Sequence, residues 1–187
     1  MADEAIKNHN ISKAIKYLQE AFKINPESHD VCLKLGILTQ QLGNLELSKE
    51  YFKKSILINS KSSLGYSNLG VIYSKLKQEK LALENYLKAL ELDPKNFLTN
   101  YNLGNYYFSI EDLENAEKYY LASIRIQPKH FYPYNNLFQI YDRSNKIKKL
   151  EQITNQIINT FDGIPIAKFL QGIFEFRKKN YKKTIWI

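Results

Sequence analysis

The stretch SLGYSNLGVIYSKLKQEKLALENYLKALELDPKN, residues 63–96, decides the fold. Its apolar residues recur at the three- and four-residue spacing that is typical of two amphipathic helices. Small residues stand at Gly70, Ala82 and Ala89, where the two helices of a hairpin have to cross at close range. Asp93-Pro94 ends the second helix, because proline disfavours α geometry in the residue before it. Residues 63–96 therefore predict one antiparallel pair of helices.

The same pattern returns along the chain every 34 residues, at Leu35-Gly36, Leu69-Gly70 and Leu103-Gly104. Leu137-Phe138 and Gly172 continue this phase. An aromatic residue follows each of the three Leu-Gly pairs at the same distance, at Phe52, Tyr86 and Tyr120. One such pair of helices cannot bury its apolar face alone, so successive pairs have to stack on one another.

Residues 63–96 resemble the tetratricopeptide repeat, and match its pattern at Tyr66, Leu69-Gly70, Tyr73, Ala82, Tyr86, Ala89 and Pro94. The resemblance implies an all-α fold: a right-handed solenoid of stacked antiparallel helix pairs with about five and a half repeats. The predicted units, all in one solenoid domain, are a partial repeat 1–28, full repeats 29–62, 63–96 and 97–130, a degenerate repeat 131–164 and a truncated repeat 165–187.

The ends of the chain and the repeat 131–164 depart from the pattern. Met1 aligns with repeat position 7, so only Ala2–Lys7 remain of the first helix. In repeat 131–164, Phe138 replaces the glycine, and Leu150, Thr154 and Ile157 occupy the small, aromatic and small positions. We expect two helices there with an altered crossing. In the last repeat we expect a second helix to begin near Asn180-Tyr181.

Composition excludes several classes of protein. The single cysteine, Cys32, rules out an internal disulfide framework, and no run approaches 18 apolar residues, so no membrane span is expected. The acidic N-terminus has no apolar signal segment, which predicts a cytoplasmic protein. The formal net charge is +8, but only three of the 27 basic residues are arginine, and nucleic-acid readers favour the arginine fork. We therefore expect neither nucleic acid nor a membrane as partner.

No catalytic or metal-binding arrangement is recognisable in the sequence. His9, His29 and His130 fall at turns, where solvated side chains are expected, and none has a metal-ligand spacing. Cys32 is expected to be a buried small residue, and Glu111-Asp112 a helix start. We predict that this chain is not an enzyme, needs no cofactor or metal, and takes no small-molecule substrate.

The first helix of each repeat carries the candidate binding residues. Repeat position 6, which lines the concave groove in a tetratricopeptide superhelix, holds Lys34, Asn68, Asn102 and Asn136, followed by Leu170. The predicted peptide-binding residues are Lys34, Asn68, Lys75, Tyr101, Asn102, Asn105, Phe108, Tyr132, Asn135, Asn136 and Gln139. Phe169 and Phe176 add groove aromatics in the last repeat.

Asparagines at this spacing suit an extended peptide. First helices stack about 10 Å apart, and a peptide advances about 3.3 Å per residue, so one asparagine amide meets every third peptide unit. The pattern is similar to the tetratricopeptide arrays of O-linked N-acetylglucosamine transferase-like proteins, in which such asparagines hold substrate backbone. A clamp for a C-terminal carboxylate is not expected, because Tyr101, Ile166 and Leu170 stand where it needs cations or polar residues.

Two functions remain open at this stage, with a third less favoured. The chain is either an interaction scaffold that binds an extended segment of a partner protein, or the N-terminal, substrate-presenting part of a glycosyltransferase, sulfotransferase or oxygenase whose catalytic domain lies beyond residue 187. The third, nucleic-acid binding, would use Lys178, Lys179, Lys182 and Lys183. The apolar end Ile185-Trp186-Ile187 predicts either a dimer or further chain packed on it.

Overall fold

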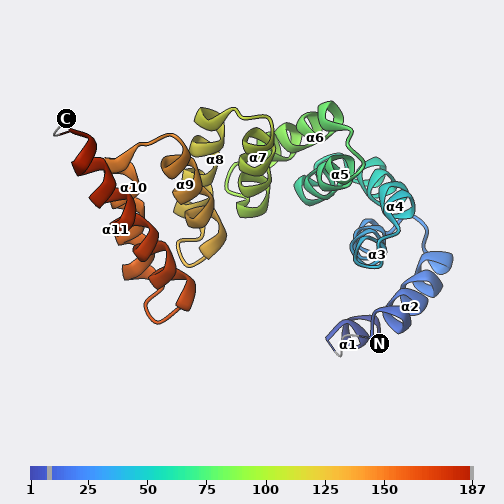
Figure 1. Cartoon of the computed structure of the whole chain (residues 1–187). Coiled ribbons are helices and arrows are strands. Elements are labelled where there is room, and N and C mark those ends of the chain that lie inside the picture. The colour runs from blue at the N-terminus through green and yellow to red at the C-terminus, as the bar shows by residue number, and fades with distance from the viewer. Residues whose placement is uncertain (8–9, 186–187) are drawn as a thin grey trace. The chain divides into compact units, whose positions relative to one another are not determined.

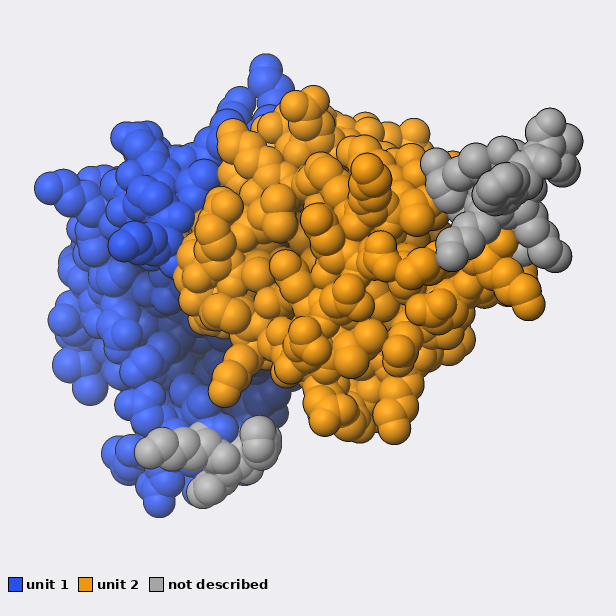
Figure 2. Space-filling model, turned by 90° about the vertical axis from the view of Figure 1, so that its left-hand side faces the viewer, with its two compact units in different colours: residues 1–95 blue, residues 96–187 orange. Residues whose placement is uncertain are grey.

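The computed structural model describes residues 1–7 and 10–185, and these residues form eleven α-helices and no strand (Figure 1). The chain divides into two compact units, Met1–Lys95 and Asn96–Ile187, which are coloured separately in Figure 2. The first unit contains α1 (Ala2–Lys7), α2 (Ile11–Ile24), α3 (His29–Gln41), α4 (Leu45–Ile58), α5 (Ser63–Lys75) and α6 (Glu79–Leu92). The second contains α7 (Phe97–Ser109), α8 (Leu113–Ile126), α9 (Phe131–Arg143), α10 (Ile147–Thr160) and α11 (Pro165–Ile185).

Within each unit, every helix packs against the next one along the chain, and α3 also contacts α5. The helix α1, Ala2–Lys7, has the bounds that the sequence predicts for the remnant of a first helix. None of the described helices combines the length and apolarity that a membrane span requires.

The helix starts follow from polar residues that recur with the repeat. Ser28, Ser62 and Asn96 each accept a hydrogen bond from the backbone N–H three residues on, and so cap α3, α5 and α7. Asp112 caps α8 in the same way through the N–H of Asn115, as predicted for Glu111-Asp112. His130, at the corresponding position before α9, makes no capping bond. The sequence thus sets most helix starts locally.

The turn inside each helix pair uses one residue in the left-handed region. Gly43 has a φ of 79°, and the residues at the same repeat position, Lys77, Glu111 and Asn145, have φ values of 61°, 61° and 52°. A side chain raises the energy of this conformation, which glycine adopts freely. Three of the four turns therefore depend on the packing of the helices that they join.

That packing centres on glycine against an aromatic ring. A Cβ atom built on Gly36, Gly70 or Gly104 would lie 2.5, 2.6 and 2.6 Å from the ring of Phe52, Tyr86 and Tyr120, respectively. These distances are far shorter than van der Waals contact, so the ring occupies the space that a side chain would need. The predicted requirement for a small residue at this crossing is confirmed.

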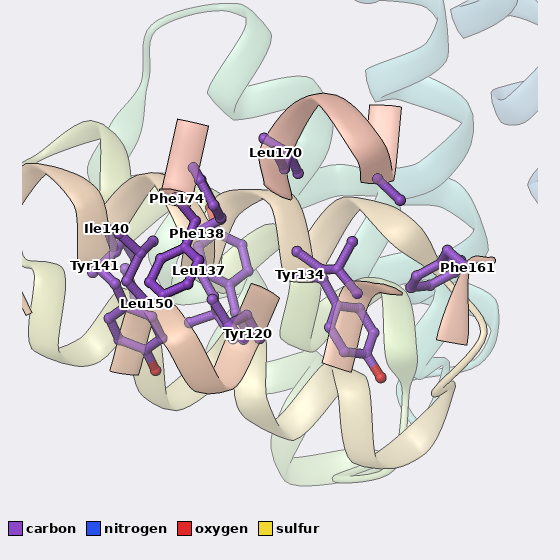
Figure 3. Packing of buried hydrophobic residues seen from close by; sticks show 14 residues of the cluster. Tyr120, Tyr134, Leu137, Phe138, Ile140, Tyr141, Leu150, Phe161, Leu170 and Phe174 are labelled. Carbon is purple, nitrogen blue, oxygen red and sulfur yellow. The ribbon is translucent and has the colours of Figure 1, made fainter. Parts of the chain in front are cut away.

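In repeat 131–164 the large and small residues exchange places. Phe138 on α9 is 3% exposed, and Thr154 on α10, at the position of the aromatic ring, is fully buried. Phe138 lies with Leu150 and Phe174 in the buried cluster of the second unit (Figure 3). The two helices expected here are present. The bulk that α10 lacks is supplied by α9.

The prediction for the last repeat was wrong. We expected a second helix to begin near Asn180-Tyr181, but α11 runs without interruption from Pro165 to Ile185. Trp186 and Ile187, expected to form an apolar end with Ile185, lie outside the described residues.

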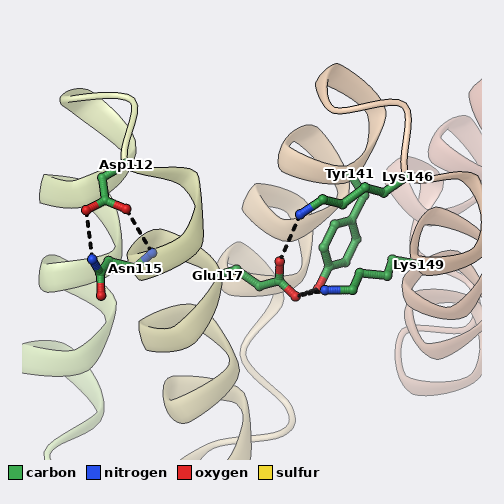
Figure 4. Close-up of polar contacts among 6 residues, drawn as sticks. All are labelled: Asp112, Asn115, Glu117, Tyr141, Lys146 and Lys149. Atoms are coloured by element: carbon green, nitrogen blue, oxygen red, sulfur yellow. Dashed lines mark hydrogen bonds and ion pairs between the residues drawn. The ribbon is translucent and has the colours of Figure 1, made fainter.

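A half-buried carboxylate joins α8 to the next helix pair (Figure 4). Glu117 accepts a hydrogen bond from the hydroxyl of Tyr141 at 3.0 Å, binds the ammonium of Lys149, and pairs with that of Lys146 at 3.5 Å. Burial raises the pKa of Glu117, but the hydrogen bonds from Lys149 and Tyr141 lower it, and the resulting pKa lies below the usual value.

We expect Gly104→Ala to lower the free energy of unfolding by about 1–2 kcal/mol, because the clash with Tyr120 outweighs the gain in helix propensity. Gly172→Ala is the matched control, since a Cβ there meets no atom within 4 Å. It should raise the free energy of unfolding by about 0.5–1 kcal/mol. Urea denaturation at low protein concentration measures both, and equal effects of the two substitutions would contradict this account.

We expect Glu117→Gln to lower the free energy of unfolding at pH 7 by about 1–2 kcal/mol, because a charge-assisted hydrogen-bond network is lost. The pKa of Glu117 is lowered in the folded chain, so its stabilising effect is present above the pKa of the unfolded chain and disappears as the pH falls through the folded value. The difference from the native chain should therefore shrink as the pH falls below the ordinary glutamate pKa of 4.5. Glu114→Gln, which removes an exposed carboxylate from the same helix, is the control at pH 7 for the loss of one negative charge.

Candidate functional site

The predicted binding residues of the first unit lie on α3 and α5, and two of them are held within the chain. The ammonium of Lys34 lies 2.9 Å from Oδ1 of Asp3 and 3.1 Å from Oδ2 of Asp30. Hydrogen bonds to these carboxylates raise the pKa of Lys34. Asn68 donates through Nδ2 to the carbonyl of Leu64 in its own helix at 2.9 Å. Lys75, at the end of α5, is exposed.

In the second unit, three side chains from α7, α8 and α9 form a hydrogen-bonded network. Oδ1 of Asn105 accepts from the hydroxyl of Tyr120 at 2.8 Å and from Nδ2 of Asn136 at 3.1 Å. Burial raises the pKa of Tyr120, so its phenol stays protonated and able to donate. The predicted residues Asn102, Asn135 and Gln139 are half-buried on the same two first helices, α7 and α9.

The network fixes which way the two amides face. An amide oxygen has two lone pairs, and both of those on Asn105 are used. Among the described residues, the hydrogen bonds leave Nδ2 of Asn105 as a donor and Oδ1 of Asn136 as an acceptor. Two residues on neighbouring first helices therefore present one donor and one acceptor in fixed orientation.

Sequence reasoning identified the asparagines but missed how they are paired. Asp3 and Lys34 are 31 residues apart, as are Asn105 and Asn136, and each pair joins repeat position 9 to position 6 of the next repeat. For Asn68 the residue at position 9 is Ile37, which cannot form a hydrogen bond through its side chain. A search for polar pairs at this spacing would have found both.

The histidines do not lie as predicted. We expected His29 and His130 to be solvated, but both are half-buried. His29 places Nδ1 at 2.8 Å from Oγ of Ser55 and 3.0 Å from its carbonyl oxygen. The ring centroid of His130 lies 4.4 Å from that of Phe97. Within the described residues the buried Nδ1 of His130 has no hydrogen-bond partner. His9 is outside the described residues.

The aromatic residues predicted for the groove differ in exposure. Tyr101 is half-buried, with its ring centroid 6.1 Å from that of Phe97 and 6.0 Å from that of Tyr120. Phe108 is half-buried too, and the guanidinium of Arg143 lies 5.2 Å from its ring centroid. Tyr132 is 60% exposed and lies 5.6 Å from the ring of His130. Tyr132 is thus the predicted aromatic most open to a ligand on α7 and α9.

Cys32 is buried, as predicted, and burial raises the pKa of its thiol. In the part of the chain that the structure describes, no three His, Cys, Asp or Glu side chains are grouped so as to hold a metal ion. Lys178, a residue of the nucleic-acid hypothesis, forms an ion pair with Glu151 at 2.7 Å.

Family comparisons agree with the repeat phase. Three models described as tetratricopeptide repeat match residues 29–62, 63–96 and 85–118. The first two ranges have the same bounds as two units predicted from the sequence. No curated protein matches the chain.

Solved structures of similar fold cover most of the chain. MamA is 21% identical with a TM-score of 0.73, over 83% of this chain and 94% of that one. PilF of Pseudomonas aeruginosa is 18% identical with a TM-score of 0.80, over 95% and 82%. YrrB, described as a tetratricopeptide-repeat protein with an unusual peptide-binding site, is 18% identical with a TM-score of 0.69, over 91% and 88%. The chain therefore carries tetratricopeptide repeats and has the all-α fold of a tetratricopeptide-repeat solenoid.

Proposed function

We propose that this chain is a protein-interaction module and that its second unit binds an extended peptide segment across α7 and α9. The observation that carries the proposal is the oriented amide pair of Asn105 and Asn136. A peptide unit offers one C=O and one N–H, and these complement the Nδ2 donor of Asn105 and the Oδ1 acceptor of Asn136. Because Tyr120 and the amides hold one another in place, little side-chain entropy is lost on binding.

The spacing of the helices suits an extended ligand. Packed helices lie about 8–10 Å apart, which an extended chain spans in about three residues. The amides of Asn102 on α7 and Gln139 on α9 would then serve neighbouring peptide units. Recognition through the backbone makes binding tolerant of ligand sequence, as the resemblance to the transferase arrays implies.

Exposed apolar side chains at the N-terminal ends of the two helices supply a second element of recognition. Tyr132 on α9 and Leu98 on α7 occupy the same repeat position, and both are more than half exposed. They offer apolar contact to ligand side chains beside the amide pair. Half-buried Tyr101, Phe108 and Asn135 would act mainly by supporting this surface.

The first unit contributes a separate surface in this proposal. Lys34, Asn68 and Lys75 lie on α3 and α5, but Lys34 is already paired with two carboxylates. An acidic ligand group would have to displace Asp3, so we infer a weaker contribution from this surface. If the chain instead presents a substrate to a larger enzyme, the same residues would bind that substrate. Nothing in the described part of the chain favours this alternative over an interaction scaffold.

We expect Asn136→Ala to weaken peptide binding about tenfold, since it removes one ligand hydrogen bond and frees Asn105 to rotate. An array of unstructured peptides of about twelve residues selects a ligand, and calorimetry measures its affinity for each variant. Asn85→Ala is the control for loss of an asparagine amide outside the proposed site, because Asn85 on α6 donates only to its own helix, at the carbonyl of Leu81.

Tyr120→Phe is a second variant, which leaves both asparagines intact and removes only the hydroxyl that orients Asn105. It should weaken the same peptide by a smaller factor than Asn136→Ala while circular dichroism shows an unchanged fold. If Asn136→Ala stays folded and binds every selected peptide as tightly as the Asn85→Ala control does, the proposed site is wrong.

A further inference from the structure

One face of α11 exposes an apolar surface around Gly172. Gly172 stands at the repeat position of Gly36, Gly70 and Gly104, but no atom lies within 4 Å of the place where its Cβ would be. Phe169 and Phe176 beside it are 63% and 65% exposed. Together with Ile173 and Arg177 they line a depression in the surface. The crossing site that an aromatic ring fills in three other repeats is open here.

The opposite face of α11 is firmly attached to its own unit. Ala167, Leu170 and Phe174 are buried in the core of the second unit. Arg177 binds the carboxylate of Asp142 on α9 at 2.7 Å, and Lys178 binds that of Glu151 on α10 at 2.7 Å. The exposed face is therefore presented on a rigid helix.

The residues on the exposed face are arranged in two rows. A helix turns about 100° per residue, so Gly172 lies at the centre of this face, with Phe169 and Phe176 on one side of it. Lys168 and Glu175, both exposed, lie on the other side. Each row has one member about 4–6 Å before Gly172 along the helix axis and one member about 4–6 Å after it.

We propose that this face binds the same face of a second copy of the chain, with the two α11 helices antiparallel and crossing at Gly172. A twofold axis relates the two antiparallel helices. It places each row opposite the same row of the partner helix, and the two rows run in opposite directions. Phe169 then meets the partner's Phe176, and Lys168 meets the partner's Glu175. By symmetry each of these contacts forms twice.

Charge and shape both favour a second copy as the occupant. Within one helix, Lys168 and Glu175 are seven residues apart, about 10 Å, which is too far for an ion pair. Antiparallel pairing brings each of them to an opposite charge. Because Gly172 has no side chain, the two helix backbones can approach each other closely at this point. The rings of Phe169 and Phe176 from both copies then cover each other on one side of the crossing.

Sedimentation equilibrium of the full chain over a range of concentrations tests the proposal. We expect a reversible dimer, and we expect Gly172→Gln to weaken it at least 100-fold, because a side chain then occupies the crossing point. The substitution should leave the fold intact, since a Cβ at Gly172 meets nothing in the chain itself. Circular dichroism and thermal unfolding of the Gly172→Gln variant check this.

Exchanging the charged residues at positions 168 and 175 tests whether the two α11 helices are antiparallel. Lys168→Glu and Glu175→Lys should each weaken the dimer about tenfold, because like charges then meet twice. The double variant, Lys168→Glu/Glu175→Lys, should restore native affinity to within about threefold, and a mixture of the two single variants should form a heterodimer.

Several results would overturn the proposal. They are a native chain that is monomeric up to about 1 mM, a dimer unaffected by Gly172→Gln, and single charge variants that the double variant does not rescue. If the native chain is monomeric but a separate aromatic-bearing helix binds at Gly172, the face serves a different partner and the second copy is excluded.

Discussion

Close contact between a glycine backbone and an aromatic ring holds each regular helix pair together. The ring of Phe52, Tyr86 or Tyr120 occupies the space of the missing side chain, so the two helices can approach at one register only. The turn then has to close over a short distance, which explains why Lys77 and Glu111 adopt a left-handed conformation that neither prefers. Once the crossing is fixed, both faces of the pair are defined for stacking.

The sequence allowed the repeat phase and the buried crossings to be predicted, because both depend on residues that recur at one spacing. Gly70 and Tyr86, for example, contact each other within a single repeat. Repeat 131–164 shows the limit of this reasoning. Phe138 and Thr154 reverse the usual order of large and small, and the helices still form because total bulk across the crossing is kept.

The prediction of a turn in the last repeat was wrong because the local sequence contains no strong turn signal. Lys179 stands at the position that adopts the left-handed conformation in the four turns before it. In those repeats, packing of the second helix against the first offsets the energetic cost of the left-handed turn residue. Among the described residues no ring packs on Gly172, and helical hydrogen bonding continues through Lys179 to Ile185. Tertiary contact, rather than local preference, decides between a turn and a helix.

A regular sequence pattern does not ensure a regular site. Asparagine recurs at repeat position 6, but its hydrogen bonding depends on the residue at position 9 of the preceding repeat, which varies. Asparagine at that position gives the Asn105–Asn136 pair, aspartate gives the ion pair of Asp3 with Lys34, and isoleucine at position 37 leaves Asn68 bonded to its own helix. Position 6 alone therefore predicts where a polar side chain recurs, whereas positions 6 and 9 together determine whether two side chains on neighbouring first helices hold each other in one orientation.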